Sequence, residues 1–400
     1  MTETTDSVRS WAALAPRGLE FDPLLAELLA DEPVSRVRLP HGEGWAWLVT
    51  RYADVKLATS DPRFSRHALL GRPITRLAPH FIPLDEAVGF ADPPEHTRLR
   101  RSAAKAFSPK SMQRLLPRTR LRMNRLVDDL LRHGPPADLM AHVHRPLPLA
   151  AVSDLMGVPE PDRPAMANWT AVLLTAGAGR ERSERAKAEI GAYFTEFLAA
   201  RAPDPDGDLA GILAAAVHRG ELGLDEAVGL AVLIQASGAH AVCNNSGNML
   251  FTLLTYPDQL ARLRADPALL SRAVDELLRW IPHRNGVGMA RIATEDVRLG
   301  GVLIRAGDPV YASYLSANRD PEVFADPHRL DLDRGFNPHL SFGHGPHHCV
   351  GAALARMESE VIVSTLLERL PGLRLAVPAG EVPFQPDALI RGPETLPVTW

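Results

Sequence analysis

The chain has 400 residues, 46% of them hydrophobic and 23% charged, with a formal net charge of −4. This composition is that of an ordinary globular protein, and the slightly acidic balance gives no sign of a nucleic-acid partner. Two cysteines cannot build a disulfide scaffold, the polar start MTETTDSVRSW lacks the apolar run of a signal peptide, and no segment approaches the roughly 20 apolar residues of a membrane span. We therefore expect a cytoplasmic protein without a membrane partner. Aromatic residues are only 6%, so Leu, Ala and Val must build most of the core, which favours helices.

The first predicted elements are short. Residues 22–30 have the pattern of an amphipathic helix, and residues 34–39 and 45–49 are apolar or alternating segments around a Gly-containing turn, which predicts a β-hairpin. Residues 52–59 have a helical pattern. Residues 67–89 are interrupted by prolines and have no clean period, and a loop of this length in a compact protein is usually functional or mobile.

A basic helix is predicted to follow the turn at Asp92, where two prolines mark a helix start. His96 and Arg100 lie four residues apart and therefore share one helix face, with Arg101 beside them. On these residues alone, the simplest interpretation is a solvated basic face.

Residues 112–133 and 182–200 are amphipathic and predict two further helices. Asp225 is placed to cap a helix that continues without proline to about Leu254, roughly thirty residues or ~45 Å at the standard rise. This segment is apolar nearly all round, so we expect it to be buried in the core.

The middle of this long helix carries polar residues that a purely structural core helix does not need. It reads SGAHAV over residues 237–242, and Asn244 and Asn245 follow at once. Buried amides need hydrogen-bond partners. One interpretation of His240 is a core imidazole that merely satisfies a hydrogen bond.

A helix predicted over residues 271–282 carries Glu276 and Arg279 at i and i+3, close enough to pair, and Pro282 ends it. Such a spacing taken alone usually marks a surface pair. Alternating apolar residues and Gly turns over residues 283–311 predict short strands.

The most distinctive stretch is the segment 341–358, SFGHGPHHCVGAALARME, which places one cysteine in a turn rich in Gly and His. Gly343, Gly345 and Gly351 allow backbone conformations that a side chain would forbid, or allow a flat ligand to approach closely. Cys349 lies near the N-terminus of the helix predicted to follow, where the helix dipole favours a thiolate. A thiolate on a rigid turn is a ligand for a soft or borderline metal.

Two other interpretations of this cysteine stay open. A lone Cys is often a small buried hydrophobic residue. A zinc site is the second, because three histidines lie close by, but structural zinc needs four ligands in paired spacings and Cys243 is far upstream in an apolar helix. The histidines are His344, His347 and His348.

The segment resembles the cysteine-ligand loop of the cytochromes P450, which reads F-x-x-G-x-H-x-C-x-G in its bacterial form. The matching residues are Phe342, Gly343, Gly345, His347, Cys349 and Gly351. The resemblance implies that Cys349 is the thiolate ligand of a haem b iron, where it favours O–O cleavage.

The resemblance covers almost the whole chain and implies the fold. We expect a single domain over residues 1–400 that is mainly α with a small β subdomain, a haem-ligand loop at 341–352 and a long central helix over the haem. The β-rich parts are expected at about 30–50 and 290–312.

The resemblance also gives roles to other polar residues. His96 and Arg100 match a pair that contacts the haem propionates, and a guanidinium suits a carboxylate well. Arg291 and His347 match the third and fourth propionate contacts.

Two further sites are implied by the resemblance. Glu276 and Arg279 would form a buried ion network with Arg329 that locks the scaffold of the haem loop, and breaking such a network costs about 3–5 kcal/mol. The substrate pocket is expected to include Gly286, Val287, Gly288, Leu389 and Ile390.

The central helix departs from the family pattern. Most members read A-G-x-D/E-T where this chain has Ser237 to Ala241 (Ser237, Gly238, Ala239, His240 and Ala241), so His240 replaces the acid and Ala241 replaces the alcohol, as aligned by Gly247 and Asn248. The acid and alcohol normally relay protons to the iron-bound oxygen, which is worth on the order of two to four powers of ten. Three explanations remain: His240 relays the protons, a hydroxyl or N–H of the substrate does so with ordered water, or the reaction differs from ordinary hydroxylation.

The implied function is a haem-thiolate monooxygenase or oxidase of bacterial secondary metabolism acting on a hydrophobic small molecule. It would use O2 and electrons that pass from NAD(P)H through a reductase and a ferredoxin. A basic surface near the predicted helix after Asp92 would receive this acidic donor, since charge complementarity raises the association rate. Its residues are Arg98, Arg101, Lys105 and Lys110.

Two chemistries remain open within this class. One inserts oxygen into a C–H bond, and the other is oxidative coupling, in which a phenol or indole loses hydrogen and forms a C–C or C–N bond. A non-catalytic haem-binding recruitment or sensor protein is the alternative that the loss of the acid–alcohol pair would permit.

Overall fold

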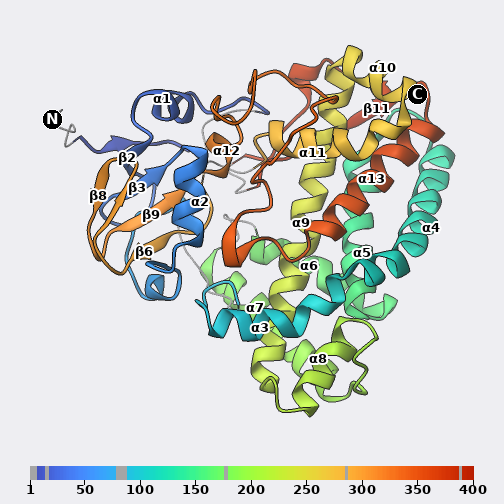
Figure 1. Ribbon diagram of the computed structural model, residues 1–400. Coiled ribbons are helices and arrows are strands. Elements are labelled where there is room, and N and C mark those ends of the chain that lie inside the picture. The colour runs from blue at the N-terminus through green and yellow to red at the C-terminus, as the bar shows by residue number, and fades with distance from the viewer. Residues whose placement is uncertain (1–6, 14–17, 78–87, 175–178, 284–286, 387–389) are drawn as a thin grey trace.

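The computed structural model describes residues 7–13, 18–77, 88–174, 179–283, 287–386 and 390–400. Figure 1 shows that helices make up most of the molecule and that a small sheet lies at one side, which confirms the mainly α fold with a small β subdomain. The predicted hairpin near the N-terminus shares one sheet with the strands at residues 291–293 and 309–312, whereas the strands at residues 297–299 and 302–304 form a sheet of their own.

The α-helices include the predicted helical segments and five further helices, at residues 146–156, 163–174, 209–218, 257–265 and 314–317, that the sequence analysis did not predict. They are α1 (Pro23–Asp31), α2 (Tyr52–Ser60), α3 (Glu95–Ala104), α4 (Pro109–His133), α5 (Pro146–Met156), α6 (Arg163–Leu174), α7 (Arg180–Ala199), α8 (Leu209–His218), α9 (Leu224–Thr255), α10 (Pro257–Ala265), α11 (Leu270–Trp280), α12 (Tyr314–Ala317) and α13 (Ala352–Arg369). A π-helix, η3 (Met140–His144), precedes α5. Single 3₁₀ turns are η1 (His67–Leu69), η2 (Lys105–Phe107), η4 (Glu160–Asp162), η6 (Pro267–Leu269), η7 (Gly345–His347) and η8 (Ala379–Glu381).

The main sheet has six strands in the order β1-β2-β3-β9-β6-β4, and two smaller sheets have the orders β10-β11-β5 and β7-β8. The strands are β1 (Arg9–Ser10), β2 (Val34–Arg38), β3 (Ala46–Val49), β4 (Phe64–Ser65), β5 (Ala137–Asp138), β6 (Arg291–Ala293), β7 (Val297–Leu299), β8 (Val302–Ile304), β9 (Pro309–Ala312), β10 (Arg374–Leu375) and β11 (Pro397–Thr399). Strand β2 pairs antiparallel with β3, with Val34 opposite Val49, which confirms the predicted hairpin.

Side chains and prolines at the helix starts explain several boundaries. Asp22 Oδ1 accepts the Leu24 N–H at 2.9 Å, and the Ser108 hydroxyl caps α4, with proline as the next residue in both cases. The start of α9 differs from the prediction: Gly223 is the N-cap and its N–H donates to the Glu226 carboxylate at 2.8 Å. Asp225 lies inside the first turn, where its charge still complements the helix dipole.

Helix α9 passes through the middle of the helical part, and α5, α6, α7 and α13 pack against it (Figure 1). Among the described helices it alone is long and apolar enough to cross a membrane, and 56% of its most apolar window is buried inside the structure. Its apolar character therefore serves the core of the protein, as predicted for a buried helix.

Two glycines of α9 allow neighbouring helices to approach closely. A Cβ on Gly238 would lie 2.8 Å from Val152 Cγ2 on α5, and a Cβ on Gly247 would lie 2.6 Å from Met140 Sδ on η3. Both distances are too short for real carbon contacts, so the packing of α9 against η3 and α5 depends on glycine at these positions.

Candidate functional site

The cysteine loop is a tight turn fixed at several points. Gly343 and Gly345 have φ angles of +79° and +73°, and a Cβ on Gly345 would clash with the carbonyl of Thr59. The Cys349 N–H donates to the Phe342 carbonyl at 2.8 Å, and α13 begins at Ala352. The turn therefore presents Cys349, which is exposed, just before a helix N-terminus, as the sequence predicted.

Aromatic contacts hold the loop against the scaffold. The Arg356 guanidinium lies 4.6 Å from the centre of the Phe342 ring, and His348 and His339 lie beside the same ring. Gly351 has Phe107 Cε1 and Cys349 Sγ near the position of an added Cβ, at 3.7 and 4.0 Å. Both are ordinary contact distances, so a Cβ would occupy space beside the sulfur that glycine leaves open.

Four of the predicted site residues meet close to the cysteine although they come from three distant segments. The rings of His96 on α3 and His347 have centroids 4.2 Å apart. Burial, followed by the charge of Arg100, lowers the pKa of His96 to about 4. Burial lowers the pKa of His347 as well, and the charges of Arg66, Arg291 and Arg100 act in the same direction.

The arginines Arg66, Arg100 and Arg291, together with the rings of His96 and His347, are here called the cationic cluster. Arg100 also interacts with the cysteine. Burial lowers the pKa of the Arg100 guanidinium, and the charge of Cys349 opposes that shift. The thiolate and the guanidinium therefore lie within electrostatic reach of each other. Arg66, next to strand β4, is a further member that the sequence analysis missed, because no motif surrounds it.

The cationic cluster has little negative charge to balance it. Asp92 raises the pKa of His96, but its carboxylate already accepts hydrogen bonds from the Ser65 hydroxyl and the Arg66 N–H. In the described part of the chain, His96 Nδ1 and Arg291 Nη2 are buried without a hydrogen-bond partner. Buried donors of this kind need an acceptor, so the cluster fits a ligand that carries carboxylates. A haem, with its metal at the thiolate and its propionates in the cluster, has this donor and acceptor pattern.

The middle of α9, residues 238–242, contains neither a carboxylate nor a hydroxyl side chain. His240 is half-buried, and its Nδ1 is buried with no partner among the described residues. Burial lowers the pKa of His240, so the imidazole is neutral near pH 7. A neutral imidazole donates a proton at one ring nitrogen and accepts at the other.

Two side-chain amides of α9, Asn244 and Asn248, have hydrogen-bond partners, whereas Asn245 Oδ1, Asn248 Oδ1 and both polar atoms of the Gln235 side chain are buried without one among the described residues. Asn244 Nδ2 donates to the carbonyl of Ile390 at 2.9 Å, and Asn248 Nδ2 donates to the carbonyl of Arg391 at 2.9 Å. Both acceptors belong to the turn near the C-terminus that was predicted to border the substrate pocket.

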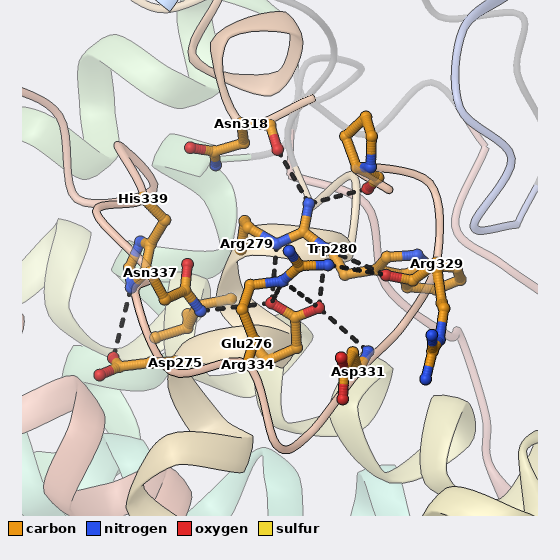
Figure 2. A network of polar contacts seen from close by, with 12 residues as sticks. Asp275, Glu276, Arg279, Trp280, Asn318, Arg329, Asp331, Arg334, Asn337 and His339 are labelled. Carbon is orange, nitrogen blue, oxygen red and sulfur yellow. Dashed lines mark hydrogen bonds and ion pairs between the residues drawn. The ribbon is translucent and has the colours of Figure 1, made fainter. Parts of the chain in front are cut away.

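A buried ion network surrounds Glu276, whose side chain is fully inaccessible (Figure 2). Arg279 donates to both carboxylate oxygens at 2.7 Å, and Arg334 Nε lies 3.1 and 3.0 Å from the same two oxygens. Asn337 Nδ2 and the Asp331 N–H complete the shell at 3.2 and 3.1 Å.

The prediction of Arg329 as the third member of this network is wrong. Arg334, five residues later, supplies the second guanidinium, and Arg329 takes part only through its main-chain carbonyl, which accepts from Arg279 at 3.2 Å. Figure 2 shows the Arg329 side chain directed away from Glu276. The chain turns between the two arginines, so the backbone of the first and the side chain of the second face the carboxylate.

Asn318 links this network to the cysteine loop. Arg279 Nη1 donates to the Asn318 carbonyl at 2.9 Å, and the Asn318 side chain bonds to Ser341 Oγ at 2.9 Å and to the Leu340 N–H at 2.7 Å. Because Ser341 begins the loop, the ion network fixes the segment that carries Cys349, and Asn318 is a supporting residue that the sequence analysis missed.

The predicted basic surface is smaller than expected. Arg98 pairs with Glu95 and Glu226, and Lys105 Nζ lies 2.9 Å from Asp206 Oδ1. Arg101 and Lys110 are exposed. Acidic residues from α9 and from the segment before α8, distant in sequence, neutralise the other two positions.

The predicted substrate-pocket residues are only partly described. Val287 is buried, and a Cβ on Gly288 would lie 3.4 Å from Tyr314 Cε2, so this glycine faces a ring at contact distance. Ile390 is half-buried, whereas Gly286 and Leu389 lie outside the described residues. In the part of the chain that the structure describes, no three His, Cys, Asp or Glu side chains gather in a manner suited to a metal such as zinc.

Comparison with known proteins agrees with this geometry. The family model described as cytochrome P450 matches residues 248–372. A biflaviolin synthase of Streptomyces coelicolor is 55% identical over 98% of this chain and 96% of its own, and a nocardicin C N-oxygenase of Nocardia uniformis subsp. tsuyamanensis is 43% identical over 99% and 100%. The solved structure of cytochrome P450mel 107F1, described as having biaryl coupling reactivity, superposes with a TM-score of 0.94 at 46% identity, covering 98% of this chain and 100% of that one. The chain therefore belongs to the cytochrome P450 family and is an oxidoreductase of the type found in actinobacterial natural-product biosynthesis.

Proposed function

We propose that this protein couples phenolic aromatic substrates oxidatively, using haem b held by Cys349. Family membership implies haem, a cysteine thiolate ligand and O2. Bound at Cys349, the haem supplies the oxidising power by activating O2, and the protein supplies orientation, exclusion of water and proton transfer.

The cationic cluster is the group that would hold the haem carboxylates. Arg100 and Arg291 offer guanidinium groups that bind carboxylates in a bidentate manner, and His96 and His347 offer ring nitrogens. The buried donors without a partner, His96 Nδ1 and Arg291 Nη2, support this assignment. Phe342, Gly343 and Gly351 would shape the space around the Cys349 sulfur.

The observation that carries the proposal is the absence of an acid–alcohol pair from α9 over residues 238–242. A phenol brings its own ionisable hydroxyl to the site, so its oxidation does not depend on an acid–alcohol pair. The biflaviolin synthase at 55% identity and the biaryl-coupling enzyme at 46% identity support the same chemistry.

The reaction balances as a four-electron reduction of O2. Joining two phenolic rings by a C–C bond removes two hydrogen atoms from the substrates. These two hydrogens, with two electrons from a ferredoxin-type donor and two protons from solvent, reduce O2 to two water molecules. The electrons come from NAD(P)H through a reductase, and no oxygen enters the product.

The imidazole of His240 can accept the phenolic proton and pass a proton on. Its neutral imidazole accepts the hydroxyl proton at one nitrogen as the ring is oxidised and passes a proton on from the other. Burial keeps the pKa of His240 low, so the imidazole does not retain the proton near neutral pH. Ala241, in the position of the usual alcohol, leaves room for the substrate hydroxyl.

Oxygen insertion is the second candidate, since a nocardicin C N-oxygenase and a mycinamicin IV hydroxylase/epoxidase of Micromonospora griseorubida are 43% and 41% identical to the chain. These named catalysts also weigh against the non-catalytic recruitment or sensor alternative.

Exact product mass distinguishes the two reactions. The enzyme is incubated with a ferredoxin, its reductase, NADPH and the probe phenol 1-naphthol, with Cys349→Ala as the inactive control. Coupling gives a product with the mass of two substrates less two hydrogens. A product with the mass of one substrate plus one oxygen contradicts the proposal.

A further inference from the structure

The turn near the C-terminus is attached to the central helix by side-chain amides. Asn244 Nδ2 donates to the Ile390 carbonyl and Asn248 Nδ2 to the Arg391 carbonyl, each at 2.9 Å. Asn244 and Asn248 are four residues apart and therefore share one face of α9. The adjacent carbonyls of Ile390 and Arg391 are thus bound by asparagines that lie one helical turn apart on α9.

Gln385 fixes the orientation of the first amide. Its Nε2 donates to Asn244 Oδ1 at 3.2 Å and to the Pro393 carbonyl at 3.3 Å, and its main-chain N–H donates to the Gly392 carbonyl at 3.0 Å. With its oxygen engaged by Gln385, Asn244 must direct its NH2 group to Ile390. Residues 384–386 and 390–393, here called the C-terminal turn, are therefore joined to α9 in one register.

The backbone of the C-terminal turn lies directly on the Asn244 amide. A Cβ on Gly392 would lie 2.6 Å from both Cγ and Oδ1 of Asn244. Asn244 and Asn248 are fully buried, so their amides have lost water and depend on these hydrogen bonds. Burying an apolar side chain here would cost less desolvation free energy than burying an amide. The hydrogen bonds of Asn244 and Asn248 therefore fix the position of the C-terminal turn as well as contributing to stability.

The anchored turn lies next to the reaction site. Asn244 follows His240 by one helical turn, an axial separation of about 6 Å. The Arg391 N–H donates to the His283 carbonyl at 2.9 Å, which joins the turn to the segment that continues to Val287 and Gly288. The C-terminal turn is thus joined to α9 through the Asn244 amide and to the segment after α11 through the Arg391 N–H.

We infer that Asn244 is a positioning residue for substrate selection, which sets the distance between the C-terminal turn and α9 and so the width of the pocket beside His240. The inference rests on the proposed function, because it takes this space as the substrate pocket. It assigns to Asn244 no contact with the reacting atoms.

Binding of two azoles of different size tests this role in the haem-loaded enzyme. Both compounds would bind the haem iron through an imidazole nitrogen, but clotrimazole carries three aryl rings that would extend into the surrounding pocket, and imidazole carries none. Asn244→Leu keeps the number and branching of the side-chain heavy atoms but removes both hydrogen bonds. We expect the Kd of clotrimazole, measured by the optical shift of the haem, to rise about tenfold, equal to about 1.4 kcal/mol, with the Kd of imidazole changed less than about twofold.

Ser246→Ala is the matched control. Ser246 is equally buried on the same helix, but its hydroxyl lies 2.8 Å from His144 Nδ1 on η3 and does not contact the turn. We expect this variant to lose thermal stability without changing the ratio of the two Kd values. Gln385→Ala, at a half-buried position, is the second variant if Asn244→Leu fails to fold, and we expect the same selective loss of clotrimazole binding.

The possible outcomes are distinct. The inference is overturned if the ratio of the clotrimazole Kd to the imidazole Kd in Asn244→Leu stays within about twofold of the wild-type ratio. If only Gln385→Ala folds, the same criterion applies to that variant. An equal change in Ser246→Ala overturns it as well, because a general loss of stability would then be the cause. Failure of the proposed coupling reaction is seen separately, in product mass, and leaves the azole result interpretable.

Discussion

His240 lies where an acid would complete the usual proton relay, and its surroundings keep it neutral. Its Nδ1 is buried without a partner in the described residues, and burial lowers the pKa of the ring. In the proposed coupling reaction, a neutral imidazole at this position can accept the hydroxyl proton of the phenol. We therefore propose that His240 accepts the proton of the substrate hydroxyl.

Replacing His240 by Leu tests this role. We expect His240→Leu to slow product formation by about 10²-fold, since general base catalysis typically contributes at least that much. Ser237→Ala is the control on the same helix, because the Ser237 hydroxyl donates only to the Leu233 carbonyl of its own helix. Turnover of His240→Leu within about twofold of this control would rule out proton transfer through His240, provided that both variants form the same carbon monoxide complex.

His144 makes the stability of the fold depend on pH. It is fully buried, its Nδ1 lies 2.8 Å from Ser246 Oγ, and burial lowers its pKa from 6.5 to about 3. Between pH 6.5 and about pH 3, His144 is protonated in the unfolded chain but neutral in the folded protein. The free energy of unfolding therefore falls as the pH drops through this range. At pH 5 this single group costs about 2 kcal/mol.

The variant His144→Asn should remove this part of the pH dependence. We expect the free energy of unfolding, measured in urea, to fall less between pH 7 and pH 5 in the variant than in wild type, by about 2 kcal/mol. Asn retains a polar group near the position of Nδ1 but does not titrate. Equal losses in the two proteins would show that His144 is not the titrating group.

At the scale of elements, the Glu276 network joins α11 to the loop that carries Cys349. Glu276 bonds to Arg279 and Arg334, and Arg279 continues through Asn318 to Ser341 at the start of the loop. Such a buried network is sensitive to the loss of one partner, because the remaining charge is left without compensation.

Arg334 and Arg329 form a matched pair for testing the network. Arg334→Gln removes a guanidinium from the buried carboxylate, and we expect a loss of about 3–5 kcal/mol in unfolding free energy together with reduced haem content. Arg329 is exposed and contributes only its carbonyl, so Arg329→Gln should cost under about 0.5 kcal/mol. Similar losses in both variants would contradict the observed assignment.

These elements also mark what the sequence could and could not predict. The long proline-free apolar run of α9 and the short apolar or alternating segments of β2 and β3 indicate burial directly, so these three elements were found close to their observed bounds. The choice between Arg329 and Arg334 depends on a turn of the backbone, which a sequence pattern does not specify.

The candidate site shows the same division. Cys349 and its glycines are recognisable because a tight loop restricts the residues at many consecutive positions. Arg66 has no such local pattern and joins the cationic cluster only through the fold. The pairing of Arg98 with Glu226 on α9 was hidden for the same reason, since the partners are far apart in sequence.

For the whole molecule, we propose that the remaining exposed cations near α3 guide the approach of an acidic electron donor. Arg98 and Lys105 are neutralised by acidic partners, whereas Arg101 and Lys110 are exposed. Attraction between exposed charges mainly raises the association rate and is screened by salt.

Charge reversal at these two positions tests the docking surface. We expect Arg101→Glu combined with Lys110→Glu to raise the KM for ferredoxin about tenfold at low salt, with the difference from wild type shrinking at high salt. Arg180→Glu, an exposed change on α7, is the control and should leave this KM unchanged. An unaltered KM in the double variant would place the donor elsewhere.

The fate of the oxygen atoms tests the central claim, oxidative coupling, most directly. The holoenzyme is given ferredoxin, reductase, NADPH and 1-naphthol under ¹⁸O₂, and the product is analysed by exact mass. The account predicts a dimeric product that lacks two hydrogens and contains no ¹⁸O, with the label recovered in water. A product that carries one ¹⁸O atom would identify the protein as an oxygen-inserting enzyme and contradict the account.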